Sequence, residues 1–223
     1  MLSIIMPTRG RSQQAFNCVQ RILEVTKDID FEIVISAHPD LETVQLFGSR
    51  TDSRVSIYYA EHENGIQAWN HAASKSQGDY LTVSDDDLWY HENWYVEAMR
   101  LLDPNEIMYV GIGEFGKGQD SQWGEWPERA VGTRRFFKEI IGGVLCIPHY
   151  KSHHDDVEKS DKAHMHNCIH KVDGNIEHRH YCRHAGAQRD ETNARAERWY
   201  GEDLQTYIRR KAAGFPLDYQ GVF

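Results

Sequence analysis

The sequence has few cysteines and no long apolar run. Its 223 residues include four cysteines, none of them in a Cys-x-x-Cys pair, so neither a disulfide framework nor a standard zinc ribbon is expected. No apolar stretch reaches the roughly 20 residues that cross a bilayer, and residues 1–10 lack the regions of a signal peptide. We therefore expect a cytoplasmic protein without a membrane partner.

The sequence also lacks an excess of positive charge. Its 25 Lys and Arg residues face 34 Asp and Glu residues, which leaves a net charge of -9. This balance argues against a broadly electropositive nucleic-acid-binding surface, although a local basic groove is compatible with it. The length suits one sizeable domain, so residues 1–223 are predicted to fold as a single unit.

What the sequence does contain is a regular alternation of strand-like and helix-like segments. Short apolar runs at residues 2–6, 31–36, 55–59 and 80–83 read as strands, and the first three are followed by segments with apolar residues at helical spacing. Such alternation predicts an α/β fold with a mostly parallel sheet and right-handed crossovers. Ligands of such sheets bind beyond the carboxyl ends of the strands.

Three adjacent aspartates, Asp85, Asp86 and Asp87, follow the fourth of these strands. Neighbouring carboxylates repel one another unless a cation or a set of donors compensates them, and their hard oxygens suit Mg²⁺ or Mn²⁺. The alternative interpretation is a helix N-terminus, with Asp86 or Asp87 capping a helix that begins near Leu88. Both hold together if one carboxylate caps and two bind metal.

The loop after the first strand carries two arginines beside a helix start. Its sequence Pro7-Thr8-Arg9-Gly10-Arg11 suits a phosphate or a nucleotide base, because helix N-termini and guanidinium groups bind anions. Two solvated arginines are the alternative. The loop has one glycine and no lysine, which disfavours a nucleotidyltransferase phosphate loop.

The sequence patterns of helices and strands are weaker after residue 100. We expect a helix over residues 94–102, a strand at 107–110, and a long functional loop or insertion at 111–135 that contains Trp123 and Trp126. Gly142-Gly143 then precedes an apolar strand at 144–147 and permits either close approach to a ligand or a bend. An amphipathic helix is predicted from Arg195, ended by Gly214 and Pro216.

Nine histidines lie between residues 149 and 184. We predict a helix over 155–168, a turn at Asp173-Gly174 and a strand over 176–182. The pattern His-x-His-x-Cys-x-His occurs at 164–170 and again at 178–184, so two strands joined by the turn could form a zinc cluster. The competing interpretation is that one histidine completes the aspartate metal site.

The order of these motifs resembles a small GT-A glycosyltransferase of the family 2 type, possibly one that is encoded by a phage. The motifs are Pro7-Thr8-Arg9, Asn64-Gly65-Ile66 with Trp69-Asn70, Gly78-Asp79-Tyr80-Leu81, and the three aspartates. The resemblance covers residues 1–100 well and extends more loosely to 195. It implies a nucleotide-sugar-binding half (1–100), an acceptor and metal-completing half (101–195), and a C-terminal helix and tail (196–223).

The resemblance also implies ligands and roles. The donor would be a nucleotide sugar, by expectation UDP-linked, with Mn²⁺ or Mg²⁺ held by Asp85, Asp87 and His178 or His180. Thr8, Arg9 and Asp40 would hold the nucleotide, and Asp85 would touch ribose or metal. The residues expected around the donor are Pro7, Thr8, Arg9, Arg11, Asp40, Asn64, Trp69, Asn70, Asp85, Asp86, Gly142 and Gly143.

The acceptor side is the least determined. An inverting reaction needs a base, for which Asp155 or Asp156 beside His153 and His154 is expected, with Asp203 as a competitor. The acceptor would be a glycan or a hydroxymethylated base in phage DNA, contacted by Arg129, Arg134 and Arg135. In the phage case the enzyme would work in the host cytoplasm. A zinc-binding or nucleic-acid-binding module without catalysis is the remaining alternative.

Overall fold

The computed structural model describes residues 1–48, 52–114, 127, 129–179 and 190–223. Within these residues eight strands form one sheet in the order β3-β2-β1-β4-β7-β6-β8-β5. The strands are β1 (Leu2–Thr8), β2 (Phe31–Ala37), β3 (Val55–Tyr59), β4 (Tyr80–Val83), β5 (Leu88–Tyr90), β6 (Tyr109–Glu114), β7 (Arg129–Thr133) and β8 (Ile169–His178). The helices are α1 (Ser12–Val25), α2 (Leu41–Gly48), α3 (Gly65–Ala73), α4 (Val96–Leu101), the π-helix η2 (Phe136–Ile140), α5 (Asp155–Met165), α6 (Glu191–Glu197) and α7 (Tyr200–Ala212).

The first four strands are parallel, as the alternation of elements predicts. β1 pairs with β2 on one side and β4 on the other, so Leu2 lies opposite both Phe31 and Tyr80. β1 is apolar except for Ser3 and Thr8 because both of its faces are covered: Ile4 packs into one core cluster and Ile5 into the other. Their parallel direction brings the ends of β1, β2 and β4 to one edge.

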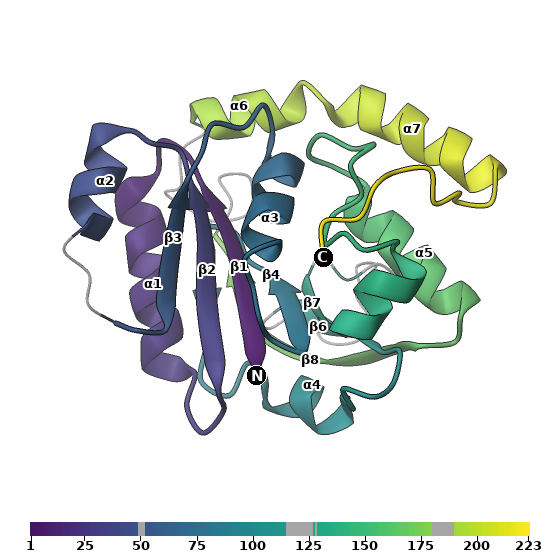
Figure 1. Ribbon diagram of the computed structural model, residues 1–223, viewed down its shortest axis with the longest axis horizontal. Helices are drawn as coiled ribbons and strands as arrows, with labels where there is room; N and C mark the ends of the chain where they lie inside the picture. Colours follow the sequence, from purple (N-terminus) through teal and green to yellow (C-terminus); the bar gives the residue numbers. More distant parts are fainter. Residues whose placement is uncertain (49–51, 115–126, 128, 180–189) are drawn as a thin grey trace.

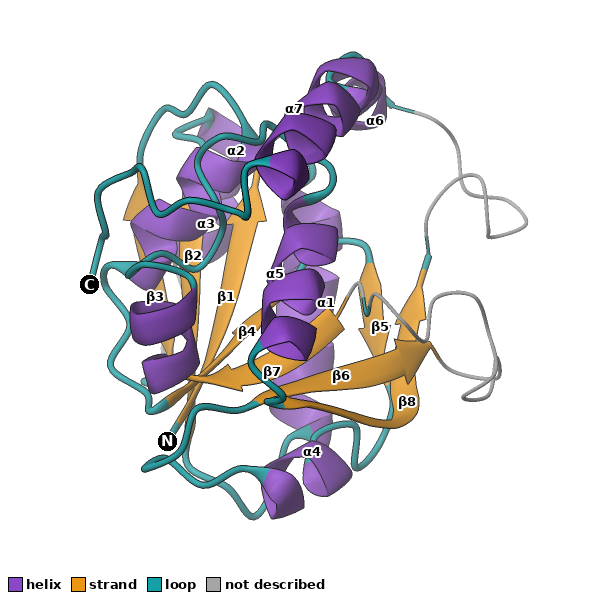
Figure 2. Ribbon diagram, turned by 90° about the vertical axis from the view of Figure 1, so that its right-hand side faces the viewer, coloured by secondary structure: helices purple, strands orange, loops and turns teal. Residues whose placement is uncertain are grey.

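Helices cover both faces of this sheet (Figure 1). α1 and α2 lie on one face and α3 on the other, and the two core clusters follow this division. α6 and α7 run across the end of the sheet toward which β1 points (Figure 2). The carboxyl ends of the strands therefore lie beneath the two C-terminal helices.

The second part of the sheet mixes directions. β7 is antiparallel to β4 and β6, while β6 and β8 are parallel. The prediction of an irregular segment over 111–135 was wrong at both ends, since β6 extends to Glu114 and β7 begins at Arg129. Trp123 and Trp126 of this segment lie outside the described residues.

The alternative interpretation, in which Asp86 or Asp87 caps a helix from Leu88, was wrong. Residues Leu88–Tyr90 form β5, which pairs antiparallel with β8, and the next helix starts only at Val96. Leucine, tryptophan and tyrosine are compatible with a half-buried strand, and Asp86 and Asp87 bind side chains from other elements. The aspartates therefore lie in the connection between two strands.

The turn expected at Asp173-Gly174 was also wrong, because β8 continues through it. β8 pairs with β6 on both sides of a register shift between Ile112 and Glu114. A Cβ on Gly174 would lie 0.9 Å from the carbonyl oxygen of Gly113. Gly174 is therefore needed because β6 and β8 approach each other closely at this point. The close contact decides the local structure here, although Asp-Gly is typical of turns.

The prediction of a strand over residues 144–147 was also wrong. These residues are buried but irregular, and side chains take the place of a neighbouring strand. The Asn70 amide accepts hydrogen bonds from the N–H groups of Leu145 (3.1 Å) and Cys146 (2.9 Å), and donates to the Cys146 carbonyl (2.6 Å). A carboxylate oxygen of Asp155 accepts from the Ile147 N–H at 2.6 Å.

The C-terminal segment forms two helices, α6 and α7, where one was expected. Arg210 of α7 reaches the buried carboxylate of Glu158 in α5 through Nε and Nη2, at 2.8 and 3.0 Å. Tyr150 donates to the same carboxylate at 2.7 Å. Among the helices that the structure describes, none is both long and apolar enough to cross a membrane.

Candidate active site

A cavity of about 440 Å³ lies at the carboxyl edge of the sheet. Its walls come from the loop after β1, the ends of β2 and β4, the start of α3, the segment before α5, and α6. The site that the strand order predicts is therefore present, and the C-terminal half of the chain closes it.

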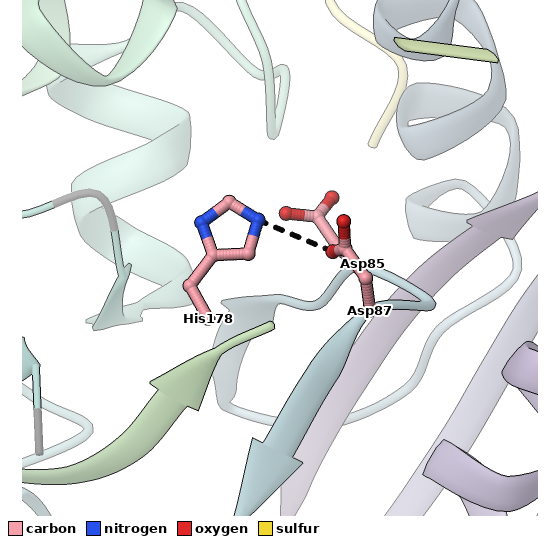
Figure 3. A group of neighbouring side chains, drawn as sticks. All are labelled: Asp85, Asp87 and His178. Carbon is pink, nitrogen blue, oxygen red and sulfur yellow. Dashed lines mark ion pairs between the residues drawn. The ribbon is translucent and has the colours of Figure 1, made fainter. Parts of the chain in front are cut away.

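A possible metal centre lies in this cavity. One oxygen each of Asp85 and Asp87 and a ring nitrogen of His178 lie within 4.8 Å of one another. His178 Nε2 is 3.3 Å from Asp87 Oδ1, and Figure 3 shows the three side chains converging. Two carboxylates and an imidazole are a donor set that suits Mn²⁺ or Mg²⁺. His180, the alternative ligand, lies outside the described residues.

Strand pairing explains how residues so far apart in the sequence meet. β5 follows Asp87 directly and β8 ends at His178, and the register places Leu88 opposite His178. The N–H of Arg179 also donates to the Asp87 carbonyl at 3.0 Å. The imidazole is thereby held beside the carboxylate by backbone hydrogen bonds.

The protonation of the aspartates differs. Burial would raise the pKa of Asp87, but the hydrogen bond and charge of His178, together with Arg11 and Arg129, lower it to about 2. Burial raises the pKa of Asp86 to about 7 against the opposing effect of Arg11. Asp87 is therefore the carboxylate prepared to bind a cation at neutral pH.

Arg11 links the aspartates to α6. Its Nη1 lies 3.0 Å from Asp86 Oδ1 and 3.6 Å from Asp87 Oδ2, and its other nitrogens bind both oxygens of Asp190 at 2.6 and 2.8 Å. Asp190 caps α6. Arg11 is thus a bridge between the metal site and the helix above it, and Thr8 adds a hydrogen bond to Asp86 at 3.2 Å.

Asp85 is paired as well. Arg129, the first residue of β7, forms an ion pair with its carboxylate and lines the cavity. Arg134 and Arg135, expected beside it, lie at the other end of β7 and bind the carbonyls of Gly78 and Asn105. These three arginines do not form one patch.

Several predicted donor residues line the cavity: Pro7, Thr8, Arg9, Arg11, Asn64, Trp69, Asp85 and Asp86. Arg9 is exposed and donates to the His62 carbonyl at 3.0 Å. Asn64 caps α3, and the indole N–H of Trp69 donates to the Ser84 carbonyl at 3.0 Å. The predicted residues that line the cavity come from the loop after β1, from the start of α3 and from the segment after β4.

The other predicted donor residues do not line it. Asp40 accepts from the N–H and hydroxyl of Thr43 at the start of α2, and Asn70 supports the segment 145–146. Gly142 and Gly143 have φ of +81° and +83°, and a Cβ on Gly143 would lie 3.1 Å from the Cα of Gly221. Here the double glycine allows the C-terminal segment to pack closely.

Three carboxylates were candidates for the base. Asp155 is buried and bound to Lys159 Nζ at 2.6 Å, and Asp203 accepts from the N–H groups of residues 151, 152 and 153. Asp156 is half-buried at the start of α5 and lines the cavity. Asp155 lines the cavity as well, but its carboxylate and that of Asp203 hold the segment before α5.

The zinc cluster proposed for residues 164–184 lacks its framework. His164 and His166 lie at the end of α5, and the turn that would have paired two strands is absent because β8 runs through it. His164, His166 and His170 are exposed and Cys168 is buried. The second copy of the pattern lies beyond His178, outside the described residues.

Sequence reasoning did not single out four cavity residues whose side chains are polar or ionisable. Ser36, His38 and His62 line the end of the cavity near β2 and β3, and Lys151 lines the end near α6. Each follows or ends an element, so proximity to strand ends was the signal for Ser36, His38 and His62. Lys151 had no such signal because its segment is irregular.

Comparison with solved structures identifies the fold. S. aureus TarS 1-349 with UDP-GlcNAc is 15% identical, with TM-score 0.62 over 86% of this chain and 60% of that one. Mannosyltransferase PcManGT from Pyrobaculum calidifontis, with GDP-Man and Mn²⁺, is 14% identical, with TM-score 0.65 over 93% and 64%. Glucosyl-3-phosphoglycerate synthase from Mycobacterium tuberculosis, with Mn²⁺, UDP and glucosyl-3-phosphoglycerate, is 12% identical, with TM-score 0.63 over 97% and 81%.

Length and sequence comparisons add two facts. The chain spans 57% of the TarS 1-349 fragment and 35% of the longer TarS chain. No curated protein matches the sequence. The model of the family described as "Glycosyl transferase family 2" matches residues 3–159. Since this match covers more than half of the chain, the protein belongs to glycosyl transferase family 2 and has the GT-A fold.

Proposed function

We propose that the protein transfers a sugar from a nucleotide-sugar donor to a hydroxyl acceptor in a reaction that depends on Mn²⁺ or Mg²⁺. The observation that carries this proposal is the convergence of Asp85, Asp87 and His178 in a cavity at the carboxyl edge of the sheet. Family membership supports it, as do structural relatives with UDP-GlcNAc or with GDP-Man and Mn²⁺. A UDP-linked donor is our first choice.

The charges of the site suit departure of a nucleoside diphosphate. When bound, the divalent ion neutralises charge that develops on the leaving diphosphate. Asp87 and His178 would hold the ion, with Asp85 as third ligand after release from Arg129. Arg11 would stay on Asp86 and keep that carboxylate from repelling the diphosphate, while Thr8 and Arg9 would lie along the nucleotide. Asn64 and Trp69 would form the wall opposite them.

Asp156 is our candidate for the base that takes the proton of the acceptor hydroxyl. Asp155 is held by Lys159, and the carboxylate of Asp203 accepts three backbone N–H groups, so neither is placed to move toward substrate. A base must come within hydrogen-bond distance of the hydroxyl. Asp156 lines the cavity at the start of α5.

The acceptor remains a glycan hydroxyl or a hydroxymethylated base in phage DNA, the latter in the host cytoplasm. For a DNA acceptor, only Arg129 of the three arginines considered lines the cavity. The separation of Arg134 and Arg135 from it favours the glycan. Lys151 and Arg195, which also line the cavity, would then contact the acceptor.

A donor screen tests the proposal. UDP-, GDP-, ADP- and dTDP-linked sugars would be incubated with the protein, with Mn²⁺ or with EDTA, and nucleoside diphosphate release measured. We expect release from one donor class in Mn²⁺ only, and its loss in Asp87→Ala. Release from no donor, together with donor binding unchanged by Asp87→Ala, would contradict the proposal.

A second measurement separates the base from the donor site. Asp156→Asn should keep donor affinity and slow transfer strongly, because the amide cannot accept the proton. Glu202→Gln, an exposed carboxylate at the start of α7, is the matched control. Unchanged transfer in Asp156→Asn would place the base elsewhere.

A further inference from the structure

The end of the cavity near β2 and β3 contains a cluster of polar side chains that the proposed transfer does not use. Ser36 comes from β2, His62 from the segment after β3, and His71 from α3. Ser36 Oγ lies 3.0 Å from His62 Nε2 and 2.9 Å from His71 Nδ1, and the two nitrogens are 3.3 Å apart. Three side chains from separate elements therefore direct one atom each to a common point.

The separation of the two nitrogens matches that between ligands around a tetrahedral metal ion, whereas the two contacts of Ser36 Oγ have hydrogen-bond lengths. Zinc binds imidazole nitrogen at roughly 2.0–2.1 Å, which places two ligands of a tetrahedral shell about 3.3 Å apart. The nitrogens of His62 and His71 have this separation. An ion above the triangle would contact both nitrogens and the hydroxyl, and its remaining position would face the cavity, which Ser36 and His62 line.

The protonation of the two histidines favours metal binding. Burial lowers the pKa of His62, and the neighbouring charges of His71 and His38 lower it further. Burial and the charge of Lys75 lower the pKa of His71. A lower pKa keeps a larger share of both rings in the neutral form, which is the form that binds metal.

A third histidine lies in the same wall. His38 lines the cavity, and its Nδ1 is buried without a hydrogen-bond partner among the residues that the structure describes. Its charge affects the pKa of His62. Imidazole donors here differ from the oxygen-rich set of Asp85 and Asp87, so the two ends of the cavity should prefer different ions.

We propose that Ser36, His62 and His71 form a second metal site, which binds one ion of Zn²⁺ type, and that an ion there competes with the nucleotide-sugar donor. The site is separate from Asp85, Asp87 and His178. Its existence does not depend on the proposed function, whereas the competition does. An ion bound through His62 and Ser36 would occupy the wall that a nucleotide must contact.

The test measures Zn²⁺ affinity by competition with a chromophoric chelator. The background variant carries two substitutions. Asp87→Asn weakens the site of Asp85, Asp87 and His178, and Cys182→Ser removes the thiol of the His-x-His-x-Cys-x-His pattern at 178–184. We expect one equivalent of Zn²⁺ to remain bound in this background. Adding His71→Asn should weaken it about tenfold or more, because asparagine can keep a hydrogen bond to Ser36 but ligates zinc poorly.

His170→Asn is the matched control, because His170 is exposed on β8 and its loss should leave the affinity unchanged. His62→Gln gives an independent second variant if His71→Asn fails to fold. Zn²⁺ affinity that is unchanged by both substitutions overturns the site, and the cluster is then a hydrogen-bond network only.

Competition is measured separately by adding UDP or GDP to the Zn²⁺ titration. Weaker Zn²⁺ binding in the presence of nucleotide, absent in His71→Asn, supports the inhibitory role. If Zn²⁺ binds through His71 and neither nucleotide weakens it, the metal site stands and the competition is overturned. Failure of the donor screen would leave the Zn²⁺ result intact, so the two proposals fail separately.

Discussion

The two parts of the sheet hold the cavity by different means. In β1 to β4, parallel backbone pairing aligns the strand ends that carry Thr8 and Ser36 and the end that precedes Asp85. Between residues 136 and 165, buried side chains hold the cavity wall in place. Asn70 and Asp155 bind the irregular segment 145–147, and Arg210 binds Glu158. Regular pairing tolerates many substitutions, whereas a support made of a few buried polar groups depends on each of them.

The largest effect is expected at the point where both parts meet. Asp87→Asn should lower kcat/KM for transfer about 10³-fold, because a bound metal contributes several kcal/mol of charge stabilisation. His178→Gln removes the ligand from the other part and should cost less, since Asp85 and Asp87 remain. Steady-state kinetics in Mn²⁺ measures both. Equal losses would show that the two parts contribute equally to the metal site.

A stability comparison comes next. Arg210→Met removes the closer of the two cations at the buried Glu158 carboxylate and leaves Lys162 Nζ at 3.8 Å, which should lower the free energy of unfolding by about 3 kcal/mol. Arg54→Met breaks the half-exposed pair with Asp52 in the first part and should cost less than about 1 kcal/mol. Urea denaturation of both variants measures the two free energies of unfolding. Similar losses of stability would contradict the proposed difference between the two parts of the sheet.

Asn70→Ala should destabilise by about 2 kcal/mol. The substitution leaves the buried N–H groups of Leu145 and Cys146 and one carbonyl without partners. Asn17→Ala, on the exposed face of α1, is the control and should change stability by less than about 0.5 kcal/mol. If Asn70→Ala unfolds at the same urea concentration as Asn17→Ala, the segment 145–147 has another support.

The smallest effect concerns pH. Burial lowers the pKa of His154, helped by the charge of His153 and opposed by Asp203. The unfolded state, with a pKa near 6.5, then binds more protons than the folded state, so stability falls as the pH drops below about 6.5. His154→Asn, which tolerates the φ of +64° found there, should flatten this decline. Denaturation midpoints at pH 7.5 and 5.5 measure it, and an unchanged slope assigns the decline to other groups.

Much of the first part was predictable from the sequence because local patterns agree with the fold. Apolar runs and helical spacing gave four strands and three helices, and the position of Asp85 to Asp87 after the fourth strand placed the metal site. The family resemblance gave His178 or His180 as a metal ligand, and the structure brings His178 Nε2 to 3.3 Å from Asp87 Oδ1. Ser36 and His38, at the end of the second strand, were within reach of the same reasoning.

The errors fall where tertiary contacts override local preference. Leu88–Tyr90 became a strand because β8 was available to pair with it, and Gly174 serves a contact with Gly113 that no local pattern reveals. Residues 144–147 have the composition of a strand, yet Asn70 and Asp155 satisfy their backbone. Each error needed knowledge of a partner distant in the sequence.

The pairing of β5 with β8 also has a kinetic consequence. His178 can approach Asp87 only after a long stretch of chain has folded back, and closing such a non-local contact is slow. If the pair forms after the transition state, a metal that binds it should leave the folding rate unchanged and slow unfolding as its occupancy rises. The bound ion would then act on the lifetime of the folded protein and not on how fast it forms.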